Sequence, residues 1–223
     1  MIINTLLASF VLDYHNMFWQ SPALSRLMRL LHSYSSMLVL VLLLFFAITG
    51  ITLNHTALIS STAGQYQHHQ QIPLPDSLQR QALPAEPAAM AALADDIRHW
   101  LAEEHQLPSG RLQLEILPDE QALLLDFKRP AGYSSVWVDF AANTVEVDNY
   151  FAGYLALAND LHKGRDAGNS WRLLIDVTAV ACIIFAVTGF YLMLLNRSRR
   201  SAGNRLALLG MVLALLAYLG SFY

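Results

Sequence analysis

The chain has 223 residues, of which 55% are hydrophobic and 14% are charged, and its mean hydropathy is +0.37. This composition is too apolar for a soluble protein of that length and indicates a membrane protein. The formal charge of -3 leaves no basic excess for phosphates, which excludes nucleic-acid binding as a main function. The single cysteine, Cys182, lies inside an apolar run, so we expect neither an internal disulfide nor a thiolate cluster.

The first segment, residues 1–25, is apolar but is interrupted by Asp13, His15 and Pro22. It lacks the basic start and the small-residue cleavage site of a signal peptide. We therefore expect an amphipathic helix that lies in the membrane interface.

Three segments are long and apolar enough to cross a bilayer. Residues 26–55 contain an uncharged run that, at 1.5 Å per residue, exceeds the hydrocarbon thickness of about 30 Å. Residues 161–195 form a polar loop and a second span, with Trp171 suited to an interface. Residues 206–223 predict a shorter third span that ends in aromatic side chains at the C-terminus.

Residues 56–160, between the first and second spans, predict a small α+β domain. Thr56 to Pro87 is polar and proline-rich, which is typical of a loop. From Ala88, apolar residues recur at helical spacing until Pro108, which predicts one helix. Four alternating runs then predict antiparallel strands: Leu112–Leu117, Ala122–Phe127, Ser134–Phe140 and Thr144–Val147. The expected fold is thus a helical membrane protein with three spans and a small helix-on-sheet domain.

The arginines set the expected orientation. Arg26 and Arg29 precede the first span, and the loop of residues 196–205 contains four further arginines. Basic loops face the cytoplasm, which puts the N-terminus inside and residues 56–160 outside. Those outer residues carry 14 acidic against 5 basic side chains, in agreement with this orientation.

Two parts of the chain share a short pattern. Leu31-His32 precedes an apolar run that closes with Ala47-Ile48-Thr49-Gly50. Leu161-His162 precedes, across a polar loop, a run that closes with Ala186-Val187-Thr188-Gly189. Because the two spans run in opposite directions, the pattern favours an inverted-topology repeat. The alternative is that small residues only let the helices approach closely, and the sequence leaves both readings open.

The chain resembles the PepSY-associated transmembrane proteins of bacterial inner membranes. The residues that carry the resemblance are LNH at Leu53–His55, DLHKGR at Asp160–Arg165, Trp171, and LID at Leu174–Asp176. The resemblance covers nearly the whole chain, although the outer domain is similar to the PepSY module only in the order of its helices and strands.

The resemblance implies a function. Larger relatives are haem-containing reductases linked to iron acquisition, and others are proposed partners of extracytoplasmic flavoproteins. It therefore implies electron transfer through haem b, from the cytoplasmic side or the quinol pool to a flavoprotein or a ferric chelate in the periplasm. This chain lacks the fourth span of those relatives, so the number of haems, one or more, stays open.

Two histidines are placed to bind one haem iron. His55 closes the first span and His162 precedes the second, so we expect both at the outer surface. Paired imidazoles at the edge of a helix bundle can hold a b-type haem. The alternative is that each makes only ordinary interfacial hydrogen bonds. Lys163 and Arg165 are expected to bind haem propionates, with acidic lipid headgroups or Asp160, Asp166 and Asp176 as alternative partners.

His32 is expected at the cytoplasmic end of the first span, 23 residues before His55 and thus about 35 Å away along a helix. One iron cannot bind both. A second haem at His32 needs a further ligand, from His15 or from another protomer of a homodimer. The alternative is an interfacial histidine without a metal.

The other histidines, His68, His69, His99 and His105, lack metal-site spacing and are expected at the solvent-exposed surface. No P-loop, GxGxxG, HExxH or CxxC motif is present. Two function classes remain. One is an electron carrier, a b-type haem oxidoreductase or a subunit of a reductase. The other is a non-redox membrane anchor whose PepSY-like domain binds an extracytoplasmic partner such as a peptidase.

Overall fold

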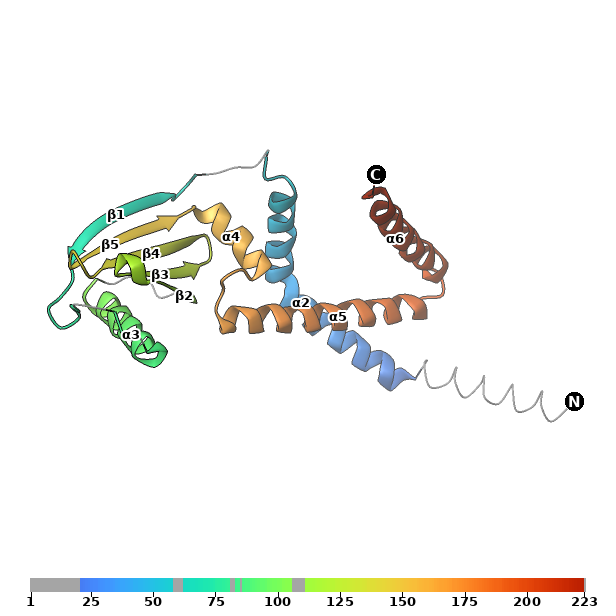
Figure 1. Cartoon of the computed structure of the whole chain (residues 1–223). Coiled ribbons are helices and arrows are strands. Elements are labelled where there is room, and N and C mark those ends of the chain that lie inside the picture. The colour runs from blue at the N-terminus through green and yellow to red at the C-terminus, as the bar shows by residue number, and fades with distance from the viewer. Residues whose placement is uncertain (1–20, 58–61, 81–82, 85, 106–110, 223) are drawn as a thin grey trace, which may run out of the picture. The chain divides into compact units, whose positions relative to one another are not determined.

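The computed structural model describes residues 21–57, 62–80, 83–84, 86–105 and 111–222 (Figure 1). The chain divides into two compact units. The helical unit is Met1–Leu44 with Asp176–Tyr223, and the sheet unit is Phe45–Ile175. The interfacial helix predicted for residues 1–25 falls mostly outside the described residues, and so does His15.

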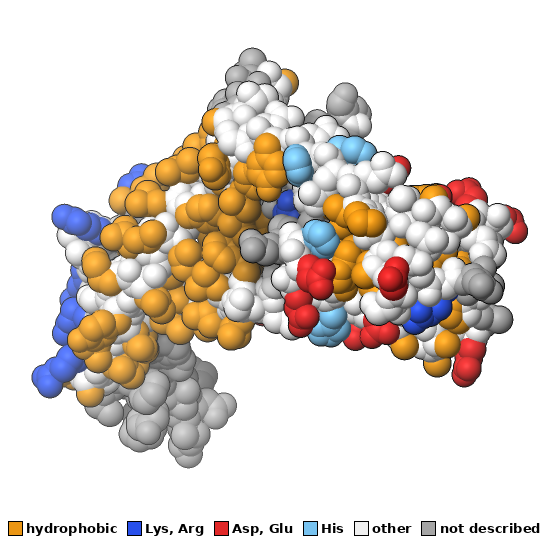
Figure 2. All heavy atoms as spheres, turned by 90° about the vertical axis from the view of Figure 1, so that its left-hand side faces the viewer, with side chains coloured by type: hydrophobic (Ala, Val, Ile, Leu, Met, Phe, Trp, Pro, Cys, Tyr) orange, Lys and Arg blue, Asp and Glu red, His pale blue; other side chains and the backbone are white. Residues whose placement is uncertain are grey.

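Three helices within the described residues are long and apolar enough to cross a membrane. They are α2 (Pro22–Asn54), α5 (Asn169–Leu195) and α6 (Arg200–Gly220). Figure 2 shows a broad surface of hydrophobic side chains over the membrane helices, and Val41 of α2 is 73% exposed. Apolar side chains are stable in such exposed positions when lipid surrounds them, whereas their contact with water would be unfavourable. The predicted helical membrane architecture is confirmed.

Helices α2 and α5 are antiparallel in the helical unit. Ser25 lies 3.4 Å from the hydroxyl of Tyr191, and His32, two turns further along α2, contacts Phe185, an earlier residue of α5. Small side chains of the two helices, Ser35, Thr178 and Ala181, are buried, as is typical where membrane helices pack closely.

The sheet unit contains a five-stranded antiparallel sheet with the order β1-β5-β4-β3-β2. The strands are β1 (Tyr66–Pro73), β2 (Arg111–Leu117), β3 (Ala122–Arg129), β4 (Gly132–Asp139) and β5 (Thr144–Phe151). The four strands predicted from alternating runs are all present. An α+β domain between the first and second spans is therefore confirmed.

Strand β1 corrects the prediction that Thr56 to Pro87 is entirely loop. It pairs with β5 along its whole length, from Tyr66 opposite Phe151 to Pro73 opposite Thr144. Its glutamine and histidine side chains are largely exposed, so they show no apolar alternation. Backbone hydrogen bonds to β5 hold the strand, and these leave no signal in the side-chain pattern.

One face of the sheet forms the hydrophobic core with helix α3 (Pro87–Glu104), as predicted from the helical spacing after Ala88 (Figure 1). The helix contributes Met90, Leu93 and Ile97, which are at most 4% exposed. The strands contribute side chains at every second position, which is the spacing of one sheet face: Leu123, Leu125, Val136, Val138, Val145 and Val147.

A short helix, α4 (Tyr154–Lys163), precedes the second span. The sequence predicted no element for residues 154–160 and a polar loop from residue 161. Gly164 ends it with a φ of 64°, the left-handed conformation that glycine adopts without strain. The next amide, of Arg165, then bonds back to the carbonyl of Asp160 at 2.9 Å. The glycine of the DLHKGR segment is thus a helix cap.

Candidate functional site

His162, on the last turn of α4, lies against α2. Its Nδ1 is 2.6 Å from the hydroxyl of Thr49, and its ring meets Phe46 edge-on with a centroid distance of 5.2 Å. A Cβ on Gly50 would be 3.6 Å from its Cε1 atom. The ring is half-buried. A threonine, a glycine and a phenylalanine of one α2 face therefore hold the imidazole.

Two further contacts fix α4 in this position. The hydroxyl of Thr52 donates to the side-chain oxygen of Asn159 at 2.7 Å, one α2 turn beyond Thr49. The indole of Trp171 donates to the carbonyl of Leu161 at 2.9 Å, next to His162 in the chain. Trp171 also packs edge-on against Phe45 of α2. The backbone that carries the imidazole is thus held from both sides.

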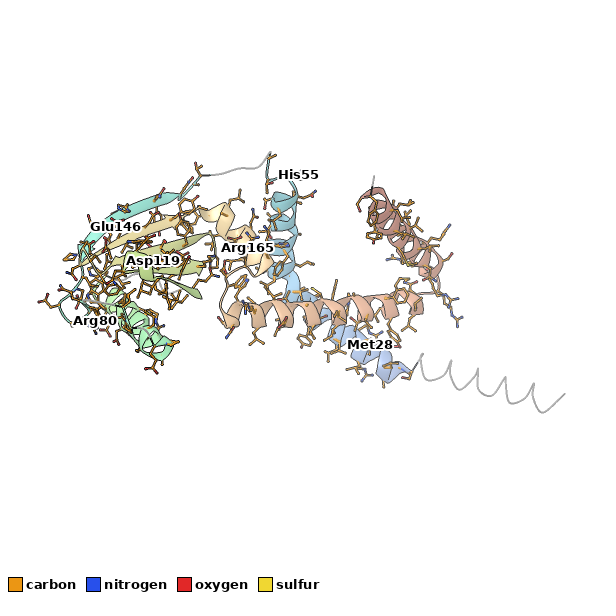
Figure 3. The ribbon with its side chains drawn as sticks, in the orientation of Figure 1. Met28, His55, Arg80, Asp119, Glu146 and Arg165 are labelled. Atoms are coloured by element: carbon orange, nitrogen blue, oxygen red, sulfur yellow. The ribbon has the colours of Figure 1, made fainter. Side chains whose placement is uncertain are left out.

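Asp160 ties the same helix to the sheet. Its Oδ2 accepts a hydrogen bond of 2.9 Å from the amide of Ala131, in the β3–β4 turn. Its Oδ1 is 3.7 Å from Arg165, whose side chain is 61% exposed. Arg165 lies near the end of α4 in Figure 3. It therefore has the protein partner that the sequence offered as the alternative to a propionate, although an exposed pair of this kind is weak.

Lys163 is exposed, and no hydrogen bond or ion pair joins it to another described residue. Its ammonium group is thus available to an anion. Propionate binding by Lys163 and Arg165 stays a prediction.

His55 lies in the turn that follows α2 and is exposed, and Figure 3 shows it at that end of the helix. Its amide bonds to the carbonyl of Ile51 at 3.1 Å, so the helical path continues to it. Six residues separate it from Thr49, a rotation of about 240° at 3.6 residues per turn. Its Cα is therefore on a different face of α2 from the one that contacts His162. The shared iron stays a prediction.

His32 lies in a matching setting in the helical unit. Its Nδ1 is 3.1 Å from the carbonyl oxygen of Phe185 and 3.2 Å from the hydroxyl of Thr188. Its ring stacks on that of Phe185 with a centroid distance of 4.6 Å and an interplanar angle of 11°. A Cβ on Gly189 would be 2.9 Å from its Cε1 atom. As at His162, the imidazole lies against a threonine and the glycine that follows it, here Thr188 and Gly189.

The two settings give the predicted repeat a physical meaning. Each histidine of a Leu-His pair contacts the Thr-Gly of the other repeat: His32 meets Thr188 and Gly189, and His162 meets Thr49 and Gly50. In both rings only Nδ1 is hydrogen-bonded to described residues, which leaves Nε2 without such a partner. The alternative was that small residues let two helices approach closely. Gly50 and Gly189 do allow a close approach, but what approaches the helix there is the imidazole ring of a histidine.

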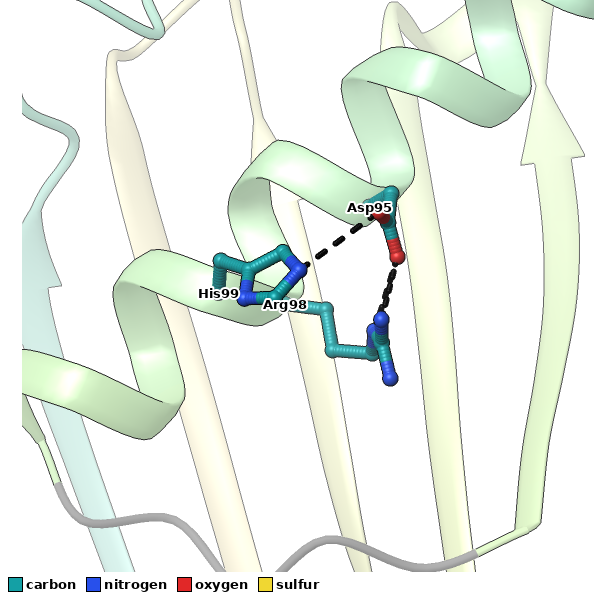
Figure 4. A network of polar contacts seen from close by, with 3 residues as sticks. All are labelled: Asp95, Arg98 and His99. Atoms are coloured by element: carbon teal, nitrogen blue, oxygen red, sulfur yellow. Dashed lines mark hydrogen bonds and ion pairs between the residues drawn. The ribbon is translucent and has the colours of Figure 1, made fainter.

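The other histidines within the described residues belong to the sheet unit, and His68, His69 and His99 are exposed as predicted, whereas His105 is half-buried. His99 lies on α3, 3.6 Å from Asp95, which also bonds Arg98 at 2.5 Å (Figure 4). His105 is packed edge-on against Trp100. His68 and His69 are exposed, although they belong to strand β1 and not to a loop.

Sequence reasoning missed the residues that hold the two imidazoles. Thr49 and Thr188 were visible only as letters of the A-[I/V]-T-G repeat, and that repeat was the one signal that pointed to them. Asn159 and Trp171 gave no signal of their contacts, because these contacts join segments distant in the sequence.

A comparison with protein-family models decides the relationship. The model of a family described as putative PepSY_TM-like matches residues 23–221. The chain belongs to this PepSY-TM-like family. The match runs from α2 to α6 and confirms the resemblance seen in the LNH and DLHKGR segments. Neither the search of curated proteins nor the search of solved structures found a match.

Proposed function

We propose that this PepSY-TM-like protein binds haem b and transfers electrons across the bacterial inner membrane. The observation that supports this most is the state of its two membrane imidazoles. His32 and His162 are each held through Nδ1, and no described residue bonds to Nε2. Iron-binding histidines in proteins are held in this way, through the ring nitrogen that does not face the metal.

The donor set fits a haem, which takes neutral imidazole nitrogens as axial ligands. Bound haem would supply a one-electron redox centre. His162 offers Nε2 on the outer side, with His55 as the proposed second ligand and with Lys163 and Arg165 as partners for propionates. His32 offers Nε2 for a second haem. Its other ligand is proposed to be His15 or a histidine of a second protomer in a homodimer.

The spacing of the two settings along α2 agrees with transfer across a bilayer. His32 and Thr49, the residue that contacts His162, are 17 residues apart, a rise of about 25 Å. The hydrocarbon core is about 30 Å thick. The proposed path runs from the cytoplasmic side or the quinol pool, through haem bound at these imidazoles, to an outer flavoprotein or ferric chelate.

Absorption spectra of the purified full-length protein, oxidised and then reduced with dithionite, test the proposal. We expect a Soret band and, on reduction, the sharp bands of a low-spin b-type haem. Protein that was expressed with adequate haem supply and shows no Soret band contradicts the proposal. In that case the alternative takes its place: a membrane anchor whose PepSY-like domain binds an extracytoplasmic partner such as a peptidase.

The proposed orientation has a separate test. Alkaline phosphatase is active only outside the cytoplasm, so a fusion within the Pro75–Pro87 stretch should be active and a fusion at Ser201 inactive. The physical reason is the cluster of arginines, Arg197, Arg199, Arg200 and Arg205, between the second and third spans. The opposite pattern of activity would reverse both the orientation and the proposed direction of electron flow.

A further inference from the structure

The hydroxyl protons of Thr49 and Thr188 are both used within their own helices. Thr49 donates to the carbonyl of Phe45 at 2.7 Å, and Thr188 donates to the carbonyl of Ile184 at 2.6 Å. A hydroxyl has one proton and two lone pairs. Each threonine oxygen therefore has only an acceptor to offer to the histidine beside it.

The proton between each pair must then come from the imidazole. The Nδ1 of His162 lies 2.6 Å from Thr49, and the Nδ1 of His32 lies 3.2 Å from Thr188. His32 also faces the carbonyl of Phe185, which can only accept. In both neutral rings, Nδ1 carries the proton and Nε2 keeps the lone pair.

We propose that Thr49 and Thr188 are positioning residues for the Nδ1-protonated tautomer: Thr49 alone holds His162, whereas Thr188 shares the holding of His32 with the carbonyl of Phe185. Each ring lies against the glycine that follows the threonine, and only at Gly189 does the ring need the space that a Cβ would fill. The A-[I/V]-T-G segments are thus two copies of one imidazole receptacle. The role as a ligand-orienting device rests on the proposed function. The tautomer and the receptacle do not, because they follow from contacts within the protein.

The two receptacles differ in their hydrogen bonds. Among described residues, the Nδ1 of His162 has one acceptor, Thr49, whereas the Nδ1 of His32 has two, Thr188 and the carbonyl of Phe185. Valine keeps the shape of threonine but has no hydroxyl. Thr49→Val should therefore release His162, while Thr188→Val should leave His32 held by the carbonyl.

The glycines differ in the opposite sense. A Cβ on Gly189 would lie 2.9 Å from the Cε1 of His32, which is too close for carbon atoms to remain in place. A Cβ on Gly50 would lie 3.6 Å from the Cε1 of His162, which is ordinary van der Waals contact. Gly189→Ala should therefore displace His32, while Gly50→Ala should be tolerated.

Nitrogen-15 NMR of the histidine rings tests this crossed pattern in the haem-free, full-length protein in detergent. The ring shifts distinguish the two neutral tautomers, and single His32→Gln and His162→Gln variants assign the signals. We expect both rings to be Nδ1-protonated. Thr49→Val should give loss of that signature at His162 alone, with Thr49→Ser restoring it. Gly189→Ala should alter His32 alone, and Thr188→Val and Gly50→Ala should alter neither ring.

An Nε2-protonated signature at either ring in the unsubstituted protein overturns the inference. So does a Thr49→Ser variant that behaves like Thr49→Val, or equal effects of the two threonine substitutions. These outcomes are independent of the visible spectrum. The crossed pattern in a protein that never binds haem would leave the receptacles in place and overturn the proposed function only.

Discussion

Replacing His162 with alanine is expected to remove the proposed haem at the Asn54 end of α2 or to convert it from low spin to high spin. A single imidazole cannot maintain the six-coordinate state, so loss of one ligand changes the spectrum even where the haem remains. The substitution leaves most of the anchoring of α4 intact, because Asn159, Asp160 and Leu161 keep their bonds to Thr52, Ala131 and Trp171. Spectra and the haem content of the purified variant measure the effect.

Alanine variants of two other histidines test which residues bind the iron. His69→Ala is the matched control, because His69 is an exposed histidine on the edge strand β1 and should leave the spectrum unchanged. His55→Ala tests the shared iron and should match His162→Ala if both bind it. Should His55→Ala keep the full low-spin spectrum while His162→Ala loses it, His162 takes its second ligand from elsewhere. Full haem in both variants would refute the assignment of either residue.

Replacing Ile97 with alanine is expected to destabilise the sheet unit by about 2–5 kcal/mol, the usual cost of truncating a buried isoleucine. Ile97 is 0% exposed and lies within the cluster formed by α3 and the sheet. The same cluster includes the stiff, β-branched side chains of Val136, Val138, Val145 and Val147, so we expect the core to collapse only partly into the space. Denaturant unfolding followed by tryptophan fluorescence is the measurement, since Trp100 and Trp137 both belong to this unit.

Ile116→Ala is the comparison variant. The same side chain on strand β2, at the sheet edge, is 42% exposed, so its truncation should cost much less than that of Ile97. Equal losses of stability in the two variants would mean that the core of the sheet unit does not lie under α3.

The elements with a strong local pattern were predictable. The uncharged run of α2 identifies a span, because no soluble fold leaves so many apolar residues without a partner. The helical spacing of Met90, Leu93 and Ile97 predicts α3, and strict alternation predicts β3, β4 and β5. The two elements that were missed, β1 and α4, lack this pattern. β1 is an edge strand of polar side chains, and α4 has no buried residue.

The candidate site was also predictable only in part. Residue types and their place at the ends of apolar runs pointed to His32, His55 and His162, since an imidazole near a membrane span suggests a ligand without any knowledge of contacts. What each imidazole touches was not readable from the sequence. His162 and Thr49 are 113 residues apart in the chain, and no local rule links them.

The sequence by itself determined the membrane class, the spans, the family and the repeated Leu-His and A-[I/V]-T-G letters, because these depend on composition and short-range spacing. Only the tertiary structure decided that the histidine of one repeat lies in the Thr-Gly of the other. It also showed that the Asp160–Arg165 segment is held by Ala131 and Trp171. The physical reason is that hydrogen bonds between distant segments depend on how the helices pack, and packing is a property of the whole chain.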